Sequence, residues 1–165
     1  MTLTSGVALI LFGAALSALL PGIGSARGTG MVGEAAAGVI TEDASKFGKV
    51  LIMQVLPGTQ GLYGFLTAIL LLSNTGILGG GFNAGEPISF EKGLAYLAAC
   101  LPIAIVGYFS AIAQAKAAVG GVGIVAKNPT QSSKGIIFAA IVETYAVLAL
   151  LVSLLSIIQI TGLNI

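Results

Sequence analysis

The chain has 165 residues, of which 56% are hydrophobic and only 8% are charged, and its net charge at pH 7 is +1. A soluble domain carries about 25% charged residues, so this composition excludes a sizeable soluble domain and indicates an integral membrane protein. Without a basic excess, a nucleic-acid partner is also excluded.

The first hydrophobic stretch runs from about Ser5 to Ile40 and has no charged residue before Arg27. A membrane-spanning helix needs about 20 apolar residues, so this stretch can span a bilayer and extend beyond it. It lacks a basic start, and we therefore expect a retained span rather than a cleaved signal peptide. Small residues recur in it at every fourth position: Ala14, Ala18, Gly22, Ala26 and Gly30.

The second hydrophobic stretch runs from about Phe47 to Gly76 and contains the sequence LPGTQ. Pro57 lacks an N–H and disturbs the preceding turn of the helix, and Gly58 loosens the helix further. A broken turn at membrane depth is tolerated where it faces protein or a water-filled cavity. Such a turn can direct oxygen atoms inward, and the candidates are the Leu56 carbonyl, the Thr59 hydroxyl and the Gln60 amide.

A glycine-rich middle connection, from Asn74 to Pro87, leads to the third hydrophobic stretch, from about Gly93 to Ala126. Its single cysteine, Cys100, excludes a disulfide within the chain, and we expect a small buried hydrophobic residue there. Small residues let membrane helices approach closely. In this stretch the small residues are Gly107, Ala111 and Ala115. The small residues of the two stretches either tighten one four-helix bundle or line a narrow inner ring of several copies.

The fourth hydrophobic stretch, from about Gly135 to Ile160, contains Glu143. An ionised carboxylate in the hydrocarbon of a bilayer costs about 2.5–3.5 kcal/mol even on insertion scales. We therefore expect Glu143 to hold a cation or a proton. Glu34 lies near the end of the first stretch, and we expect it to be an interfacial or inter-subunit charge, opposite Arg27 or a lysine.

The two short connections, residues 41–46 and 127–134, are polar and charged. Six of the seven basic residues lie on their side of the membrane, with Lys92 as the exception. The positive-inside rule therefore predicts that both connections are cytoplasmic and that both termini lie outside.

The two halves of the chain repeat each other. Ser25 pairs with Gln114 at an offset of 89, and Gln60 pairs with Glu143 at an offset of 83. The sequence thus predicts an all-α membrane protein made of a duplicated helical hairpin. The first hairpin is expected at residues 1–80, and the second, with the ion-binding carboxylate, at residues 88–165.

Three long polar side chains lie at a similar depth on three different helices. The helical rise places Gln60, Gln114 and Glu143 about 13–20 Å from the charged residues of the cytoplasmic side, near the middle of the bilayer core. Oxygen ligands suit hard cations, and a single carboxylate among neutral ligands fits a monovalent ion best. Tyr63 follows Gln60 on the same helical face, so its phenol is expected to donate a hydrogen bond to the carboxylate.

Three motifs are specific: PGIGSARGTGMVGEAAAGV, LPGTQGLYGF and KGIIFAAIVETYA. Over nearly its whole length the chain resembles the proteolipid subunit K, or c, of bacterial V-type ATPases, above all the sodium-transporting members. The resemblance implies a homo-oligomeric rotor ring in which the odd spans form the inner wall. It also implies Na⁺ coordination by Leu56 (main-chain oxygen), Thr59, Gln60, Gln114 and Glu143, with Tyr63 hydrogen-bonded to the carboxylate.

The resemblance further implies a non-catalytic, ion-translocating subunit of the cell membrane without an organic cofactor. Its partners would be identical subunits, the lipid bilayer, a stator membrane subunit that presents a cation, and a central-stalk subunit on the cytoplasmic connections. The sequence leaves three alternatives open: an H⁺-carrying rotor subunit, a four-helix cation-coupled exporter that pumps alone, and a purely structural ring or pore.

Overall fold

The computed structural model describes residues 5–79 and 88–162, and these residues form helices and turns without a strand. Four helical segments, residues 5–42, 44–74, 90–127 and 129–161, are long and apolar enough to cross a membrane, which confirms the predicted all-α fold. The elements are α1 (Ser5–Glu42), η1 (Ala44–Lys46), α2 (Phe47–Val55), η2 (Leu56–Gly58), α3 (Thr59–Asn74), α4 (Phe90–Lys127), η3 (Pro129–Gln131) and α5 (Ser132–Thr161).

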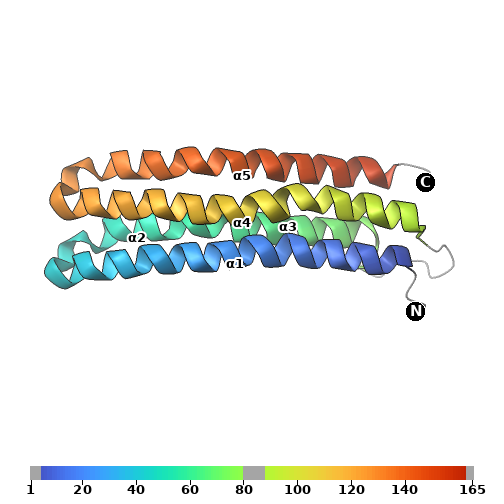
Figure 1. Ribbon diagram of the computed structural model, residues 1–165, viewed down its shortest axis with the longest axis horizontal. Helices are drawn as coiled ribbons and strands as arrows, with labels where there is room; N and C mark the ends of the chain where they lie inside the picture. Colours follow the sequence, from blue (N-terminus) through green and yellow to red (C-terminus); the bar gives the residue numbers. More distant parts are fainter. Residues whose placement is uncertain (1–4, 80–87, 163–165) are drawn as a thin grey trace.

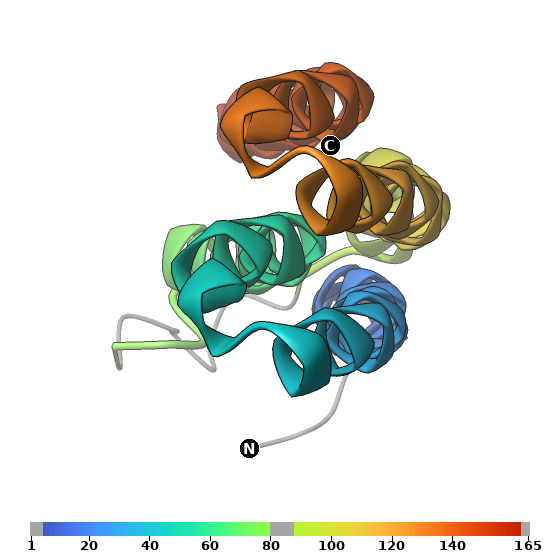
Figure 2. The ribbon, with the colours of Figure 1, turned by 90° about the vertical axis from the view of Figure 1, so that its left-hand side faces the viewer.

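The helices lie side by side along the long axis of the molecule. Figure 1 shows both short connections at one end, and the start of α1 and the end of α5 at the other. Seen from the end with the connections, α1 and α4 lie on one side, whereas α2, α3 and α5 lie on the other (Figure 2). The two hairpins thus stack against each other with α1 parallel to α4.

Glycines bring α1 and α4 into close contact. A Cβ atom on Gly24 would lie 2.7 Å from the Tyr108 carbonyl oxygen, and one on Gly93 would lie 2.6 Å from the Gly6 Cα atom. A larger side chain at either position would therefore force the helices apart. The face of α1 that contacts α4 contains Gly6, Gly13, Pro21, Gly24 and Gly28.

The small-residue stripe predicted in the first span follows this contact only in part. Ala14 is buried, but Ala26 is exposed, and a Cβ atom on Gly22 or Gly30 would meet nothing within 4 Å. A spacing of four residues turns about 40° per step around a helix of 3.6 residues per turn, so the stripe leaves the interface. The stripe of the third span, Gly107, Ala111 and Ala115, is buried throughout.

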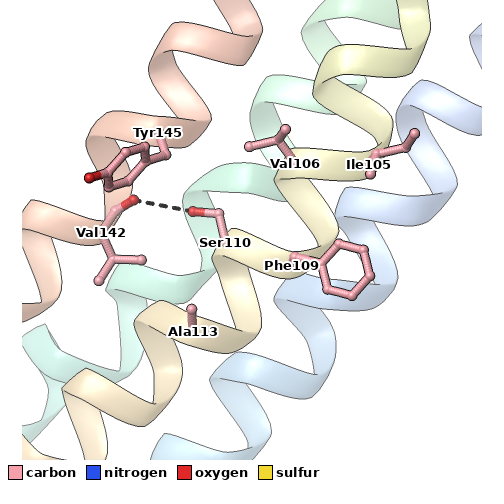
Figure 3. Close-up of a pocket in the computed structure, with 7 residues that line it drawn as sticks. All are labelled: Ile105, Val106, Phe109, Ser110, Ala113, Val142 and Tyr145. Atoms are coloured by element: carbon pink, nitrogen blue, oxygen red, sulfur yellow. Dashed lines mark hydrogen bonds between the residues drawn. The ribbon is translucent and has the colours of Figure 1, made fainter.

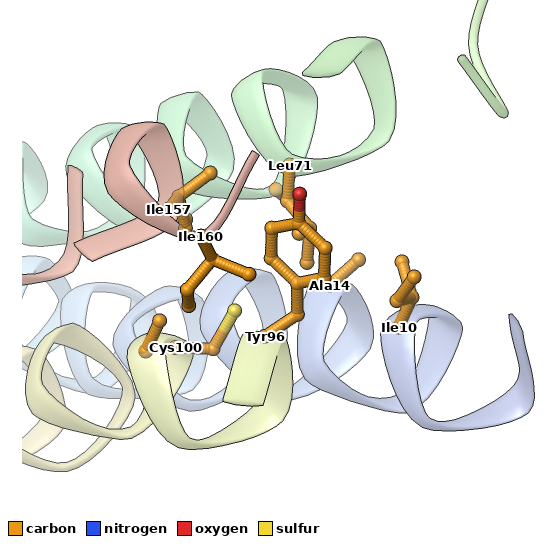
Figure 4. Close-up of a cluster of buried hydrophobic side chains, with 9 residues drawn as sticks. Ile10, Ala14, Leu71, Tyr96, Cys100, Ile157 and Ile160 are labelled. Atoms are coloured by element: carbon orange, nitrogen blue, oxygen red, sulfur yellow. The ribbon is translucent and has the colours of Figure 1, made fainter. Parts of the chain in front are cut away.

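Apolar side chains fill both ends of the bundle. Cys100, fully buried as predicted for a small hydrophobic residue, lies in a cluster near the end that holds the start of α1 (Figure 4). A second cluster lies toward the short connections and includes Val32, Met53 and Val122. The predicted polar residues Gln60, Gln114 and Glu143 lie along their spans between members of these two clusters.

The first short connection ties the hairpins together. The Lys46 Nζ atom donates to the Ala126 carbonyl oxygen over 2.9 Å, where the negative end of the α4 dipole favours a cation. Lys46 also pairs with Asp43 at 3.5 Å. Hydrogen bonds from the Ser45 hydroxyl and main-chain N–H, with the nearby Lys46 charge, hold the pKa of Asp43 below its ordinary value.

Candidate functional site

The second span is interrupted where the sequence predicted a broken turn. α2 ends at Val55, the 3-10 turn η2 carries Pro57, and α3 begins at Thr59. The Thr59 Oγ1 atom donates to the Leu56 carbonyl oxygen over 3.0 Å. The interruption thus brings a main-chain oxygen and a hydroxyl group together at the start of α3.

Polar side chains of α3, α4 and α5 meet beside this turn. The Gln60 Nε2 atom donates to Gln114 Oε1 over 2.6 Å, and Gln114 Nε2 donates to Glu143 Oε2 over 3.1 Å. The Tyr63 hydroxyl donates to Glu143 Oε1 over 2.5 Å, and Thr59 Oγ1 lies 3.4 Å from Gln60 Oε1. All six predicted site residues, including Leu56, therefore belong to one hydrogen-bonded chain.

Burial differs along this chain. Gln60 and Gln114 are fully buried between the helices, whereas Glu143 is only partly buried on α5. The Tyr63 ring packs against the apolar cluster around Ile103. The amides are thus held inside the bundle, while the carboxylate lies closer to its surface.

The groups that contact Glu143 are neutral. Its two oxygens accept hydrogen bonds from Tyr63 and Gln114, and within the described ranges the only ion pair joins Lys46 to Asp43. A carboxylate removed from water is costly unless its charge is compensated. Its direct contacts are a phenol hydroxyl and an amide N–H, and the oxygen atoms of Leu56, Thr59 and Gln60 lie further along the same chain of contacts. Such a carboxylate is suited to bind a proton or, with these oxygen atoms, a hard monovalent cation.

Ser110, which the sequence did not indicate, joins Gln114 in the contact of α4 with α5. The Gln114 amide donates to the Ala139 carbonyl oxygen over 3.2 Å, and the Ser110 hydroxyl donates to the Val142 carbonyl oxygen over 3.3 Å. Ser110 lies four residues before Gln114, so both face the same neighbour. The spacing of four residues from Gln114 is the sequence signal that could have indicated Ser110.

The two residues that follow the carboxylate, Thr144 and Tyr145, point elsewhere. The Thr144 hydroxyl donates to the Ile141 carbonyl oxygen of its own helix over 2.8 Å. Tyr145 is 64% exposed. Neither side chain joins the polar chain.

Glu34, expected to be an interfacial or inter-subunit charge opposite Arg27 or a lysine, has no such partner among the described residues of one copy. Glu34 is exposed and forms no ion pair with the described residues, and Arg27 instead donates to the Tyr108 hydroxyl over 2.9 Å. A role for Glu34 between subunits stays a prediction, and much of the glycine-rich middle connection, residues 80–87, lies outside the described residues.

Apolar grooves open on each hairpin. The groove between α4 and α5 has a volume of about 400 Å³, and a groove of about 240 Å³ lies between α1 and α2. Figure 3 shows the first groove beside the hydrogen bond from Ser110 to Val142. Its lining residues are Ile105, Val106, Phe109, Ser110, Ala113, Val142 and Tyr145.

Comparison with known proteins finds relatives over nearly the whole chain. A protein of Enterococcus hirae named V-type sodium ATPase subunit K is 47% identical over 158 residues, which cover 96% of each chain. A protein of Methanocaldococcus jannaschii named A-type ATP synthase subunit K is 40% identical over 143 residues, which cover 87% of this chain and 59% of that protein.

A family model matches the chain twice. The family described as the C subunit of ATP synthase matches residues 12–71 and again residues 97–156. One match lies in each half of the chain, as a duplicated hairpin requires. The chain therefore belongs to the ATP synthase C-subunit family and contains the family's module in two tandem copies.

Proposed function

We propose that this chain is the rotor-ring subunit of a V-type ATPase and carries Na⁺ across the membrane. The chain of polar contacts from Leu56 to Glu143 is the observation that carries this proposal, because it connects the oxygen atoms of Leu56, Thr59 and Gln60 through Gln114 to one carboxylate at mid-span. The name of the Enterococcus hirae relative, V-type sodium ATPase subunit K, supports the choice of ion.

In this proposal the residues of the polar chain have separate roles. Na⁺ is held by the Leu56 carbonyl and by side chains of Thr59, Gln60, Gln114 and Glu143. Glu143 supplies the single negative charge, so a filled site is neutral. The Tyr63 hydroxyl holds the carboxylate in place and is not itself a ligand. The two hairpins, 1–80 and 88–165, are the units of duplication, and only the second carries the acid.

Transport follows from the cost of an ionised carboxylate in lipid. A filled Glu143 crosses the lipid as a nearly neutral group, whereas an empty one does not. A cationic residue of the stator membrane subunit releases the ion, and the ring then turns by one step. The cytoplasmic connections bind a subunit of the central stalk, which couples rotation to ATP hydrolysis elsewhere in the complex, so this chain is not catalytic itself.

The two grooves suit assembly of identical copies into a closed ring. They belong to different hairpins, which lie at opposite ends of the stack in Figure 2. Contacts between unlike faces generate a ring when the rotation closes. At the offset of 89, Pro21 and Gly24, which contact α4, correspond to Ser110 and Ala113 in the groove of the second hairpin.

Carbodiimide labelling of the complete ATPase complex tests the choice of ion. The reagent modifies a protonated carboxyl group, so bound Na⁺ should slow the labelling of Glu143 at neutral pH, while an equal concentration of K⁺ should not. The Glu143→Gln variant should show no labelling at this position and no ion transport.

Three outcomes would support the alternatives instead. If millimolar Na⁺ gives no protection, the H⁺-carrying rotor is favoured. If the purified protein by itself exports drugs from liposomes along an ion gradient, the exporter is favoured. If Glu143→Gln leaves the function of the complex intact, a structural ring or pore is favoured.

A further inference from the structure

Ser25 of α1 forms a polar contact with α3 next to the polar chain. Its Oγ atom accepts a hydrogen bond from the main-chain N–H of Gly61 over 2.9 Å. Ser25 is only 7% exposed, and Gly61 follows Gln60 directly in the chain. The contact thus joins α1 to the main chain that carries one of the proposed ligands.

The N-terminus of α3 lacks a cap from its own segment. The first N–H groups of a helix need acceptors from outside the regular ladder, and a side chain at the N-cap position usually supplies one. The N-cap residue of α3 is Gly58, which has no side chain to do so. Gly61 is the third residue of α3, and Ser25 supplies an acceptor for its N–H from another helix.

α1 also contacts the rest of the interrupted turn. A Cβ atom on Gly28 would lie 2.8 Å from the Pro57 Cβ atom, and one on Gly61 would lie 3.2 Å from the Ser25 Cβ atom. The turn from Pro57 to Gly61 therefore rests on a closely fitting face of α1. Within this face, the Ser25 hydroxyl is the group that fixes the turn by a directional bond.

The internal repeat gives independent support. Ser25 occupies the position of Gln114 at the offset of 89. Gln114 reaches from α4 to the Ala139 carbonyl of α5 over 3.2 Å, and Ala139 corresponds to Leu56 at the offset of 83. Ser25 in the first hairpin and Gln114 in the second are thus equivalent residues. Each bonds to the main chain of the next span at the level of the polar chain.

We infer that Ser25 is a positioning residue for the ion site. By capping α3 it holds the Leu56 carbonyl, the Thr59 hydroxyl and the Gln60 amide in register with Glu143. It touches neither the carboxylate nor the proposed ion, so it acts on the neutral ligands and not on protonation of the acid. The inference rests on the proposed transport of Na⁺.

The Ser25→Ala variant of the complete complex tests this role by carbodiimide labelling of Glu143. We expect the Na⁺ concentration for half protection to rise roughly three- to tenfold, the range for loss of one neutral hydrogen bond. The pH midpoint of labelling without Na⁺ should stay unchanged. Ser25→Thr, which keeps a hydroxyl, should recover most of the Na⁺ affinity.

Ser17→Ala is the matched control. Ser17 is also a buried serine of α1, but its hydroxyl donates to the Ala14 carbonyl of its own helix over 2.9 Å. The inference is overturned if Na⁺ protects Ser25→Ala as well as the unmodified chain, if Ser17→Ala shifts protection equally, or if the pH midpoint moves with the Na⁺ midpoint.

Two further results keep the test decisive. If Ser25→Ala complexes do not assemble, Gly61→Ala replaces that variant, since its Cβ atom would press on Ser25 and displace the N–H. An unchanged Na⁺ midpoint in Gly61→Ala then overturns the inference. Absence of Na⁺ protection in the unmodified complex would instead overturn the proposed function, so the two failures are distinguishable.

Discussion

Each oxygen of the Glu143 carboxylate has its own neutral donor, Tyr63 at 2.5 Å and Gln114 at 3.1 Å. The two donors differ in how firmly they are held. Gln114 is fully buried and also bonds to Gln60 and Ala139, whereas Tyr63 is partly exposed. In the proposed site, the contact of Tyr63 is therefore the one that would open for an ion to enter or leave.

Tyr63→Phe should weaken Na⁺ binding although all the proposed ion ligands stay in place. A hydrogen bond to a charged group contributes about 1.5–3 kcal/mol, so we expect the Na⁺ concentration for half protection to rise about tenfold or more. Carbodiimide labelling without Na⁺ should also become faster. Tyr145→Phe, an exposed tyrosine on α5, is the control, and equal behaviour of the two variants would contradict the role of Tyr63.

Thr59→Val tests whether the hydroxyl is an ion ligand. The change removes one oxygen and keeps the shape, so Na⁺ protection should weaken while labelling of the protonated carboxyl persists. Thr144→Val is the matched control, because the Thr144 hydroxyl bonds only within α5. Full Na⁺ protection in Thr59→Val would remove this residue from the ligand set.

At the scale of helices, prolines and glycines set the distance between α1 and α3. Pro21 lies inside α1 and has no N–H to offer the Ser17 carbonyl, four residues earlier. Gly64 of α3 approaches that carbonyl so closely that a Cβ atom would overlap its oxygen. Membrane helices tolerate such a proline where a neighbouring helix contacts the freed group.

Gly64→Ala should therefore separate α1 from α3. Overpacking typically costs about 1–3 kcal/mol, and here the obstacle is rigid main chain. We expect the ring to dissociate at a lower temperature in detergent, as seen on gels after stepwise heating. Gly48→Ala on α2 is the control because its Cβ atom would meet nothing within 4 Å. If both variants dissociate at the same temperature, the close contact at Gly64 is not essential.

At the scale of the whole molecule, one acid serves two hairpins. Gln60 stands where Glu143 stands in the repeat, and both belong to the same polar chain. In the proposed site, the first hairpin would thus contribute only neutral ligands, and the second would contribute Gln114 and the charge of Glu143. Each copy in the proposed ring would carry one ion for its four spans.

Cysteine cross-linking tests the proposed contact between copies. At the offset of 89, the contact of Gly24 with Tyr108 corresponds to a contact of Ala113 with Leu19 of the neighbouring copy, and both of these residues are exposed in the single subunit. With Cys100→Ala as background, Leu19→Cys combined with Ala113→Cys should give a ladder of covalent oligomers after oxidation. Each single variant should give at most dimers. A product that stays monomeric would contradict docking of α1 in the groove between α4 and α5.

The sequence by itself determined the four spans, the duplication and the position of the acid. These follow from hydropathy, from the repeat between the two halves and from one charge in an apolar stretch. All three can be recognised along the chain without knowing how the helices pack. The break at Pro57 was predictable for the same reason, since proline disturbs its own turn. The common depth indicated Gln60, Gln114 and Glu143, the break at Pro57 indicated the Leu56 and Thr59 oxygens, and the spacing to Gln60 indicated Tyr63. The family resemblance implied the same six residues.

Only the tertiary structure decided which helix faces meet. Sequence spacing placed Gly22 and Gly30 in the close contact of α1, yet Gly24 and Gly28 lie there. It did not indicate that Arg27 bonds to Tyr108. It aligned Ser25 with Gln114 but did not show that Ser25 bonds to the Gly61 N–H of α3. The rotation of a helix about its axis depends on how its neighbours pack, and in uniformly apolar spans the sequence pattern sets that rotation only weakly.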